Sequence, residues 1–420
     1  MSEDRGQMPP GENLVGADLV GPDVSWHVPE LGQSLGVGCD EGGRVLTPPG
    51  AVPAALWMFN GGIRPLDGCG VVPARSHNQT PLPVEQIDHL VPAREASNGR
   101  FHETHLTALG ATLLDRLAVP PARIVLSAHG FGWSAYAAIR KGQPAYANAM
   151  AAVAAHVRLA RAAGLRPVVP FVTMVHGESD AGLSRAAYAG HLREFLADLR
   201  ADIRAATGQA QAPFLLIGQT GAQHWGRVSD VALAQLEVSG ADILCAGPKY
   251  QWDFSDPLHL TSDGYRRMGE QMGAMAAARL AGQRAGPLRP VALERVDARR
   301  IRLRFEVPVP PLRIDPAQGV GDPGDCGIEV YVRRQGWLRV AVRAVGKAGP
   351  ASVILRLGEA VEGLPVHVRL GMSGTGRQGP QTGPRTVIHD SETAIGVLTG
   401  APLTHWCAHA VLTDPPEAAP

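Results

Sequence analysis

A serine near the start of the chain and an acid–histidine pair late in it are the residues best suited to chemistry. Ser34 is flanked by Gly32 and Gly36, and small neighbours allow a sharp turn that exposes a hydroxyl. Asp256 and His259 lie three residues apart, so the carboxylate can hold one imidazole nitrogen while the other takes the serine proton. This combination predicts a nucleophilic serine. His259 would act as general base and then as general acid, and Asp256 would fix its tautomer.

A nucleophilic serine also needs hydrogen-bond donors about 3 Å from the charge that develops on the substrate. The amide of Ser34 is one candidate for this oxyanion hole. The segment 127–134 supplies two more, because the amides of Gly130 and Gly132 can approach a ligand closely without a side chain. His176 follows another apolar run. It is a candidate side-chain donor, and a hydrogen-bonded loop histidine is an equal alternative.

Strands and helices alternate between residues 21 and 283, which predicts a doubly wound α/β domain. Short apolar runs predict buried parallel strands at 24–31, 55–59, 123–127, 167–175, 213–217 and 243–246. Apolar residues at helical spacing predict helices at 146–163, 185–207, 228–239 and 262–281. Ser262 is expected to be the N-cap of the last helix. Each chemical segment follows a predicted strand, and such folds form their sites where strands end.

The character of the sequence changes at a predicted linker over residues 284–290. Beyond it, short alternating runs between Gly- and Pro-rich turns predict a small all-β sandwich domain over 291–413. Its strands are expected at 300–307, 327–333, 337–344, 352–357 and 365–370. Polar, Gly- and Pro-rich composition is typical of a mobile arm over residues 1–20, and 414–420 is expected to be a loose tail.

Size and composition narrow the class of protein. A chain of 420 residues, 45% hydrophobic and 19% charged, fits two globular domains. The 39 basic and 39 acidic residues balance, which argues against nucleic acid or an anionic membrane as the main partner. No apolar stretch is long enough to span a bilayer, and the first residues lack a signal-peptide pattern. We therefore expect a cytoplasmic protein, with export by another route as the alternative; the oligomeric state is left open.

Four segments, taken in order, resemble the sequence blocks of SGNH-type esterases. They are Gly32-Gln33-Ser34, the glycines of 130–132, His176-Gly177-Glu178-Ser179-Asp180 and Asp256-x-x-His259-Leu260. The likeness is strongest to the sialate O-acetylesterase and acetylxylan-esterase branch, and it spans roughly residues 24–283. It implies a flavodoxin-like three-layer α/β/α fold. It also implies Ser34 as nucleophile, His259 as base and Asp256 as its orienter. A glycine amide of the second block would line the oxyanion hole, with Gly132 ranked before Gly130.

The chain departs from that branch at His176, where the branch has Gln and other SGNH enzymes have Asn. A neutral imidazole can donate one hydrogen bond, so the donor role depends on the tautomer. Glu178 matches the branch and, with Gln33, is assigned a supporting role. Glu178 would brace the loop or serve as a second acid partner for His259, ranked after Asp256 because the spacing of Asp256 is better.

Together these observations predict a metal-independent carboxylester hydrolase that needs no cofactor and forms an acyl-serine intermediate. The resemblance implies removal of O-acetyl groups from a carbohydrate of sialic acid or xylan type, or from another small ester. Arg64, after the second predicted strand, is a candidate contact for a substrate carboxylate, although a lone arginine is more often a solvated surface residue. His102 and His105 lack the spacing of a zinc-binding helix.

Two alternatives stay open. The segment 32–36 also matches the nucleophile elbow of α/β-hydrolases, although its serine follows the first strand, which is early for that fold. The chain could instead be a degenerate hydrolase that serves as a carbohydrate-binding or structural module. The presence of Ser34, Asp256 and His259 together argues against a binding module, which needs none of them.

Overall fold

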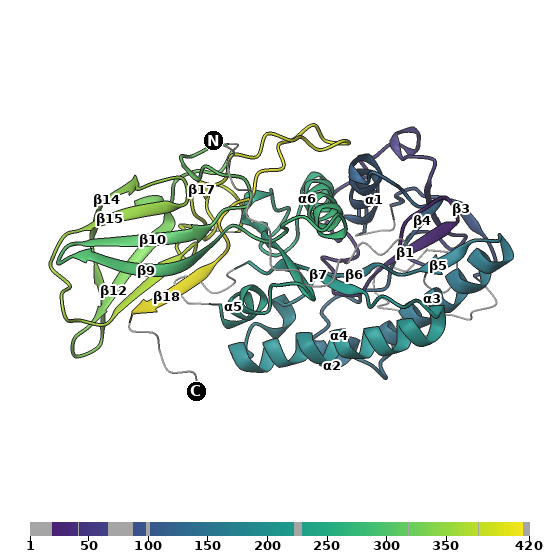
Figure 1. Ribbon diagram of the computed structural model, residues 1–420, viewed down its shortest axis with the longest axis horizontal. Helices are drawn as coiled ribbons and strands as arrows, with labels where there is room; N and C mark the ends of the chain where they lie inside the picture. The colour runs from purple at the N-terminus through teal and green to yellow at the C-terminus, as the bar shows by residue number, and fades with distance from the viewer. Residues whose placement is uncertain are drawn as a thin grey trace, which may run out of the picture.

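The chain forms an α/β part followed by a β part, as shown by the computed structural model (Figure 1). The structure describes residues 19–40, 42–65, 87–97, 101–221, 229–317, 319–376 and 378–414. Most of the predicted arm and of the predicted tail lies outside these residues. The two parts occur in the predicted order, so this level of the fold prediction is confirmed.

The α/β part is built on an eight-stranded sheet in the order β3-β2-β4-β1-β6-β7-β8, with β5 also paired to β1. Its strands are β1 Val24–Glu30, β2 Leu56–Phe59, β3 Leu90–Pro92, β4 Arg123–Ala128, β5 Arg166–Val168, β6 Phe171–Met174, β7 Phe214–Gln219 and β8 Ile243–Pro248. Only β3 pairs antiparallel. All seven residues of β1 are buried, as expected for a strand covered on both faces.

Helices cover both faces of this sheet (Figure 1). They are α1 Leu106–Arg116, α2 Tyr136–Ile139, α3 Pro144–Ala162, α4 Arg185–Thr207, α5 Asp230–Glu237 and α6 Ser262–Leu280. Helices α1 and α6 pack together on one face, while α3, α4 and α5 lie along the other. The close α1–α6 contact depends on glycine, because a Cβ at Gly269 would lie 2.1 Å from the His105 carbonyl oxygen.

Several elements differ from the expectation. The predicted strand at 167–175 is divided into β5 and β6 on either side of Pro170, which has no amide hydrogen for a ladder bond. Thr261 rather than Ser262 caps α6, since its hydroxyl accepts from the Gly264 amide at 3.1 Å. The predicted strand at 337–344 is two strands that belong to different sheets. Elements α1, α2 and β3 were not predicted, and neither were the strands at Arg289–Asp297, Arg313–Ile314, Ile388–His389 and Ala410–Asp414.

The β part contains two four-stranded antiparallel sheets, β14-β15-β10-β9 and β13-β12-β16-β18, and a two-stranded sheet, β11-β17. Its strands are β9 Arg289–Asp297, β10 Arg300–Glu306, β11 Arg313–Ile314, β12 Ile328–Arg333, β13 Trp337–Val340, β14 Val342–Lys347, β15 Ser352–Leu357, β16 Val366–Leu370, β17 Ile388–His389 and β18 Ala410–Asp414. Side chains from both four-stranded sheets, including Leu303 and Val330, share one apolar core.

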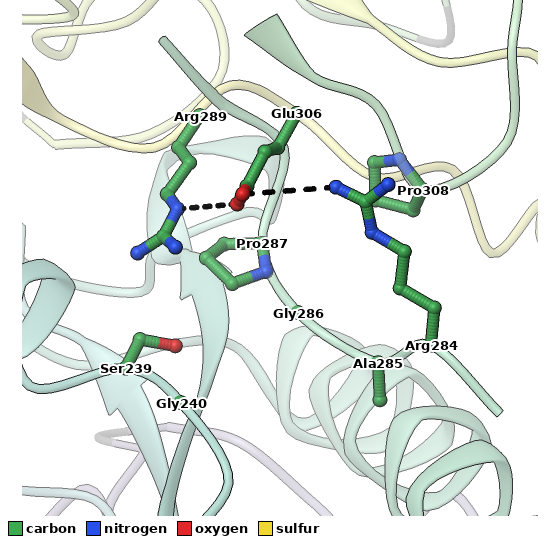
Figure 2. A pocket seen from close by; sticks show the side chains of 9 residues that line it. All are labelled: Ser239, Gly240, Arg284, Ala285, Gly286, Pro287, Arg289, Glu306 and Pro308. Atoms are coloured by element: carbon green, nitrogen blue, oxygen red, sulfur yellow. Dashed lines mark hydrogen bonds and ion pairs between the residues drawn. The ribbon is translucent and has the colours of Figure 1, made fainter. Parts of the chain in front are cut away.

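Polar contacts join the two parts. The Tyr250 hydroxyl donates to the Cys407 carbonyl oxygen at 2.8 Å, and the Gln219 side chain bonds both backbone groups of His409 at 2.9 Å. Where the chain passes from α6 to β9, Arg289 and Arg284 flank Glu306 beside a small pocket, at 2.7 and 3.8 Å (Figure 2). Side chains of the α/β part therefore bond backbone groups of the β part, in addition to the covalent connection between the two parts.

Candidate active site

Ser34, His259 and Asp256 form a continuous hydrogen-bonded chain. The distance from Ser34 Oγ to His259 Nε2 is 2.9 Å, and that from His259 Nδ1 to Asp256 Oδ2 is 2.7 Å. Ser34 lies in the loop after β1, and the other two lie in the loop between β8 and α6. The sheet therefore brings the loops that follow β1 and β8 together at one edge. Both side chains are buried there, with Ser34 6% and His259 4% exposed.

The surroundings of Asp256 fix the histidine tautomer. Its Oδ1 accepts from the backbone amides of Leu258 at 2.6 Å and His259 at 2.7 Å. Burial acts to raise the pKa of Asp256, but the hydrogen bonds from the His259 ring and these amides outweigh it and hold the pKa below its usual value. An ionised Asp256 can only accept, so Nδ1 carries the proton and Nε2 is left to accept from the Ser34 hydroxyl.

A buried carboxyl group lies directly beneath the Ser34 loop. Glu30 Oε2 accepts from the Gly130 amide at 3.2 Å, and a Cβ at Gly36 would lie 1.8 Å from Oε1. A Cβ at Gly32 would lie 2.5 Å from the same oxygen. The flanking glycines of the motif therefore make room for Glu30. Burial raises the pKa of Glu30 to about 8, so the group is mainly neutral at pH 7.

The candidate oxyanion donors are not equivalent. The Gly130 amide is engaged by Glu30 and is not available to a ligand. The amides of Ser34 and Gly132 make no hydrogen bond with another residue in the described part of the chain. The Phe131 amide donates to the Gly32 carbonyl at 3.2 Å, which holds the Gly132 loop against the Ser34 loop. Of the three candidate amides, those of Ser34 and Gly132 are thus the two that no other described residue occupies.

His176 differs from the expectation of a side-chain donor. It is buried, with Nε2 2.9 Å from the Ser134 carbonyl oxygen and Nδ1 2.9 Å from the Tyr188 hydroxyl. Because a carbonyl only accepts, Nε2 carries the proton and Nδ1 accepts from Tyr188. Burial lowers the pKa of His176 and favours this neutral form. Both ring nitrogens are occupied, so His176 supports the loop that contains Ser134 and has no donor left for substrate.

Gln33 and Glu178 lie beside Ser34 in a supporting arrangement. Gln33 Nε2 donates to Glu178 Oε2 at 3.0 Å, and Gln33 Oε1 accepts from the Ser179 amide at 3.3 Å. Lys249 Nζ forms a buried ion pair with Glu178 Oε1. Burial acts to raise the pKa of Glu178, but the Lys249 charge together with hydrogen bonds from Lys249, Thr220 and the backbone outweighs it, so the pKa lies below its usual value. Glu178 therefore braces the loop, whereas the His259 ring is held by Asp256.

Arg64 is not available to a substrate. The residue is 4% exposed, and its guanidinium donates to the carbonyl oxygens of Val37 at 3.1 Å and Ala96 at 2.5 Å, with a longer contact to His102. These bonds fasten the segment after Ser34 to Ala96 and His102. The expectation of a substrate-facing arginine is therefore replaced by a structural role, for which burial lowers the pKa of Arg64.

Three residues near the site were not singled out from sequence. Glu30 had a signal, since it is the one charge in a strand directly before the serine motif. Lys249 had another, because the chain contains only three lysines. Trp133 had none beyond its place in the glycine segment.

No set of three or more His, Cys, Asp or Glu side chains in the described ranges could hold a metal ion. Within those ranges, too, every helix is too short or too polar to cross a bilayer.

Comparisons with known proteins concern the fold. No family model and no curated protein sequence matches the chain. The crystal structure of XAC1771, a carbohydrate acetylesterase from Xanthomonas citri, aligns with 93% of this chain and 80% of its own, at 15% identity and a TM-score of 0.52. Est24, a carbohydrate acetylesterase from Sinorhizobium meliloti, covers 61% of this chain and 98% of its own (13% identity, TM-score 0.30). The aryl esterase of M. smegmatis covers 60% of this chain and 97% of its own (12% identity, TM-score 0.31). The first alignment shows a fold shared over nearly the whole chain.

Proposed function

We propose that this protein is a serine carboxylester hydrolase of the SGNH type. The observation that carries the proposal is the hydrogen-bonded chain from Ser34 Oγ through His259 to Asp256. Ser34 attacks the ester carbonyl while its proton passes to Nε2, and the amides of Ser34 and Gly132 stabilise the oxyanion. His259 then protonates the leaving alcohol. Water, activated by the same nitrogen, hydrolyses the acyl-serine.

The strand order supports the SGNH assignment. Without the edge strands β2 and β3, the sheet runs β4-β1-β6-β7-β8, which is the flavodoxin-like order 2-1-3-4-5. In folds with that order, the site lies next to β1, where the order of successive strands in the sheet reverses. Ser34 follows β1 directly. We retain residues 21–283 as the catalytic domain, 284–290 as the linker and 291–413 as the second domain.

The proposed substrate is an O-acetyl ester of a carbohydrate, of sialic acid or xylan type. Two observations support it. The sequence blocks resemble the sialate O-acetylesterase and acetylxylan-esterase branch, and XAC1771, which shares the fold, is described as a carbohydrate acetylesterase. The experiment is acetate release from acetylated sialic acids, acetylated xylo-oligosaccharides and aryl acetates.

The decisive variant is Ser34→Ala. If Ser34, His259 and Asp256 act as a unit, turnover of an aryl acetate falls by about 10⁶-fold. Ser352→Ala, the same change on a strand of the β part, is the matched control and leaves turnover unchanged. A chelator should also leave the rate unchanged. Retained activity in a folded Ser34→Ala protein would place the nucleophile elsewhere, and no acetate from any substrate would favour a carbohydrate-binding module.

A further inference from the structure

Trp133 is an exposed tryptophan beside the candidate oxyanion glycine. Its side chain is 72% exposed, the highest fraction of any large apolar residue in the part of the chain that the structure describes. Its backbone φ is +61°, a left-handed conformation that is uncommon for a residue with a Cβ. Such conformations cluster at functional sites and persist where the surrounding structure enforces them.

The loop around Trp133 is held on both sides. Before it, the Phe131 amide donates to the Gly32 carbonyl at 3.2 Å. After it, His176 Nε2 donates to the Ser134 carbonyl, and the Tyr136 amide donates to Asp180 Oδ2 at 2.8 Å. The indole is therefore exposed although hydrogen bonds hold the backbone of its loop on both sides.

The aromatic residues on either side of Trp133 point inward. Phe131 and Tyr136 are each 2% exposed and pack in the apolar core beneath α3 and α4. Trp133 alone points to solvent, on a loop bonded to the one that carries Ser34. A large flat surface is thus held in water on the residue that follows Gly132, a candidate oxyanion donor.

We propose that Trp133 is a specificity-determining residue whose indole stacks on the apolar face of the pyranose ring that carries the ester. The negative face of an aromatic ring attracts the polarised C–H groups of a sugar, and an indole offers the largest such surface. The inference rests on the proposed function, since it requires the acyl group to lie at Ser34. It adds the residue that would select cyclic saccharide esters over acyclic esters of equal reactivity.

The test compares an acetylated methyl xylopyranoside with ethyl acetate, which has no ring to stack. In Trp133→Ala, we expect KM for the glycoside to rise about tenfold with little change in kcat, while kcat/KM for ethyl acetate stays within about twofold. Trp133→Phe keeps an aromatic face and should recover most of the loss. Both replacements keep a Cβ, so the backbone conformation is equally demanding in each. Trp337→Ala, at a second exposed tryptophan among the described residues, is the matched control and should alter neither substrate.

An equal loss on both esters would make Trp133 a residue that only shapes the loop, and an unchanged KM for the glycoside would exclude stacking. Either result overturns the inference while leaving the esterase proposal intact. Failure of the esterase proposal has a different signature: wild-type hydrolysis of ethyl acetate is absent or persists in Ser34→Ala, and the stacking role then falls with it.

Discussion

Glu30 makes the stability of this protein depend on pH in a direction that can be measured. Its pKa rises from 4.5 to about 8 because the group is buried under the Ser34 loop. A shift of this size corresponds to about 5 kcal/mol of differential interaction. The folded protein keeps the proton where the unfolded chain has released it. The contribution of Glu30 is therefore fully present below pH 4.5 and is lost as pH rises toward 8, by about 1.4 kcal/mol per pH unit.

The variant Glu30→Gln isolates this effect. Its carbonyl oxygen can accept from the Gly130 amide as Oε2 does, and its amide group does not titrate. Other buried groups, such as Glu95 with its pKa raised to about 7 by burial, are present in both proteins and cancel in the difference. The stability of the variant relative to the wild type should therefore increase by about 3.5 kcal/mol between pH 5 and pH 8.

Urea unfolding of both proteins at pH 5, 6, 7 and 8 measures this difference. Glu359→Gln, at an exposed carboxylate 3.0 Å from Arg334, is the control and should give a nearly flat difference. A constant difference between Glu30→Gln and the wild type over this range would show that Glu30 is already ionised in the folded protein. The argument that the glycines of the serine motif enclose a neutral carboxyl group would then fail.

Two further predictions concern the same edge of the sheet. Gly36→Ala would place a Cβ 1.8 Å from Glu30 Oε1, so the free energy of unfolding should fall by about 1–3 kcal/mol and turnover should drop. Gly240→Ala is the control: a Cβ there would meet open space, so neither quantity should change. His129 is buried and its pKa is lowered to about 3, so its contribution is lost as pH falls below about 6.5. The free energy of unfolding of His129→Gln, measured in urea, should therefore increase relative to that of the wild type as the pH is lowered. A difference between the two proteins that does not depend on pH would contradict this.

Local sequence patterns located the strands that carry the site, because buried parallel strands are apolar runs and sites follow their ends. The same patterns missed α1. Its first eight residues, from Leu106 to Leu113, are all buried, and a helix covered on all sides has no polar face to mark its period. The break at Pro170 was visible in the sequence, but whether a proline ends a strand or only interrupts one depends on its neighbours in the sheet.

Roles that depend on distant partners could not be assigned from sequence. Arg64 and His176 have suitable chemistry for contacting a substrate, yet carbonyl oxygens from other segments occupy their donors. Lys249 is the reverse case. Lysine is a residue type that usually lies on the surface, yet Lys249 is buried, because Glu178 faces it and forms an ion pair with it. In each case the deciding fact is which oxygen lies within hydrogen-bond distance, and that is a property of the packed chain.

The proposed nucleophile and base are connected by more than their own hydrogen bond. Asp40, six residues after Ser34, accepts from the amide and hydroxyl of Ser262 at 2.8 and 2.9 Å, and Ser262 follows His259 at the start of α6. Gln33 is bonded to Glu178 on the other side. These contacts do not involve the Ser34 hydroxyl, so Ser34→Ala should leave both loops in place. A loss of turnover in that variant then reports the missing nucleophile, because the geometry that would otherwise explain the loss is fixed by separate bonds.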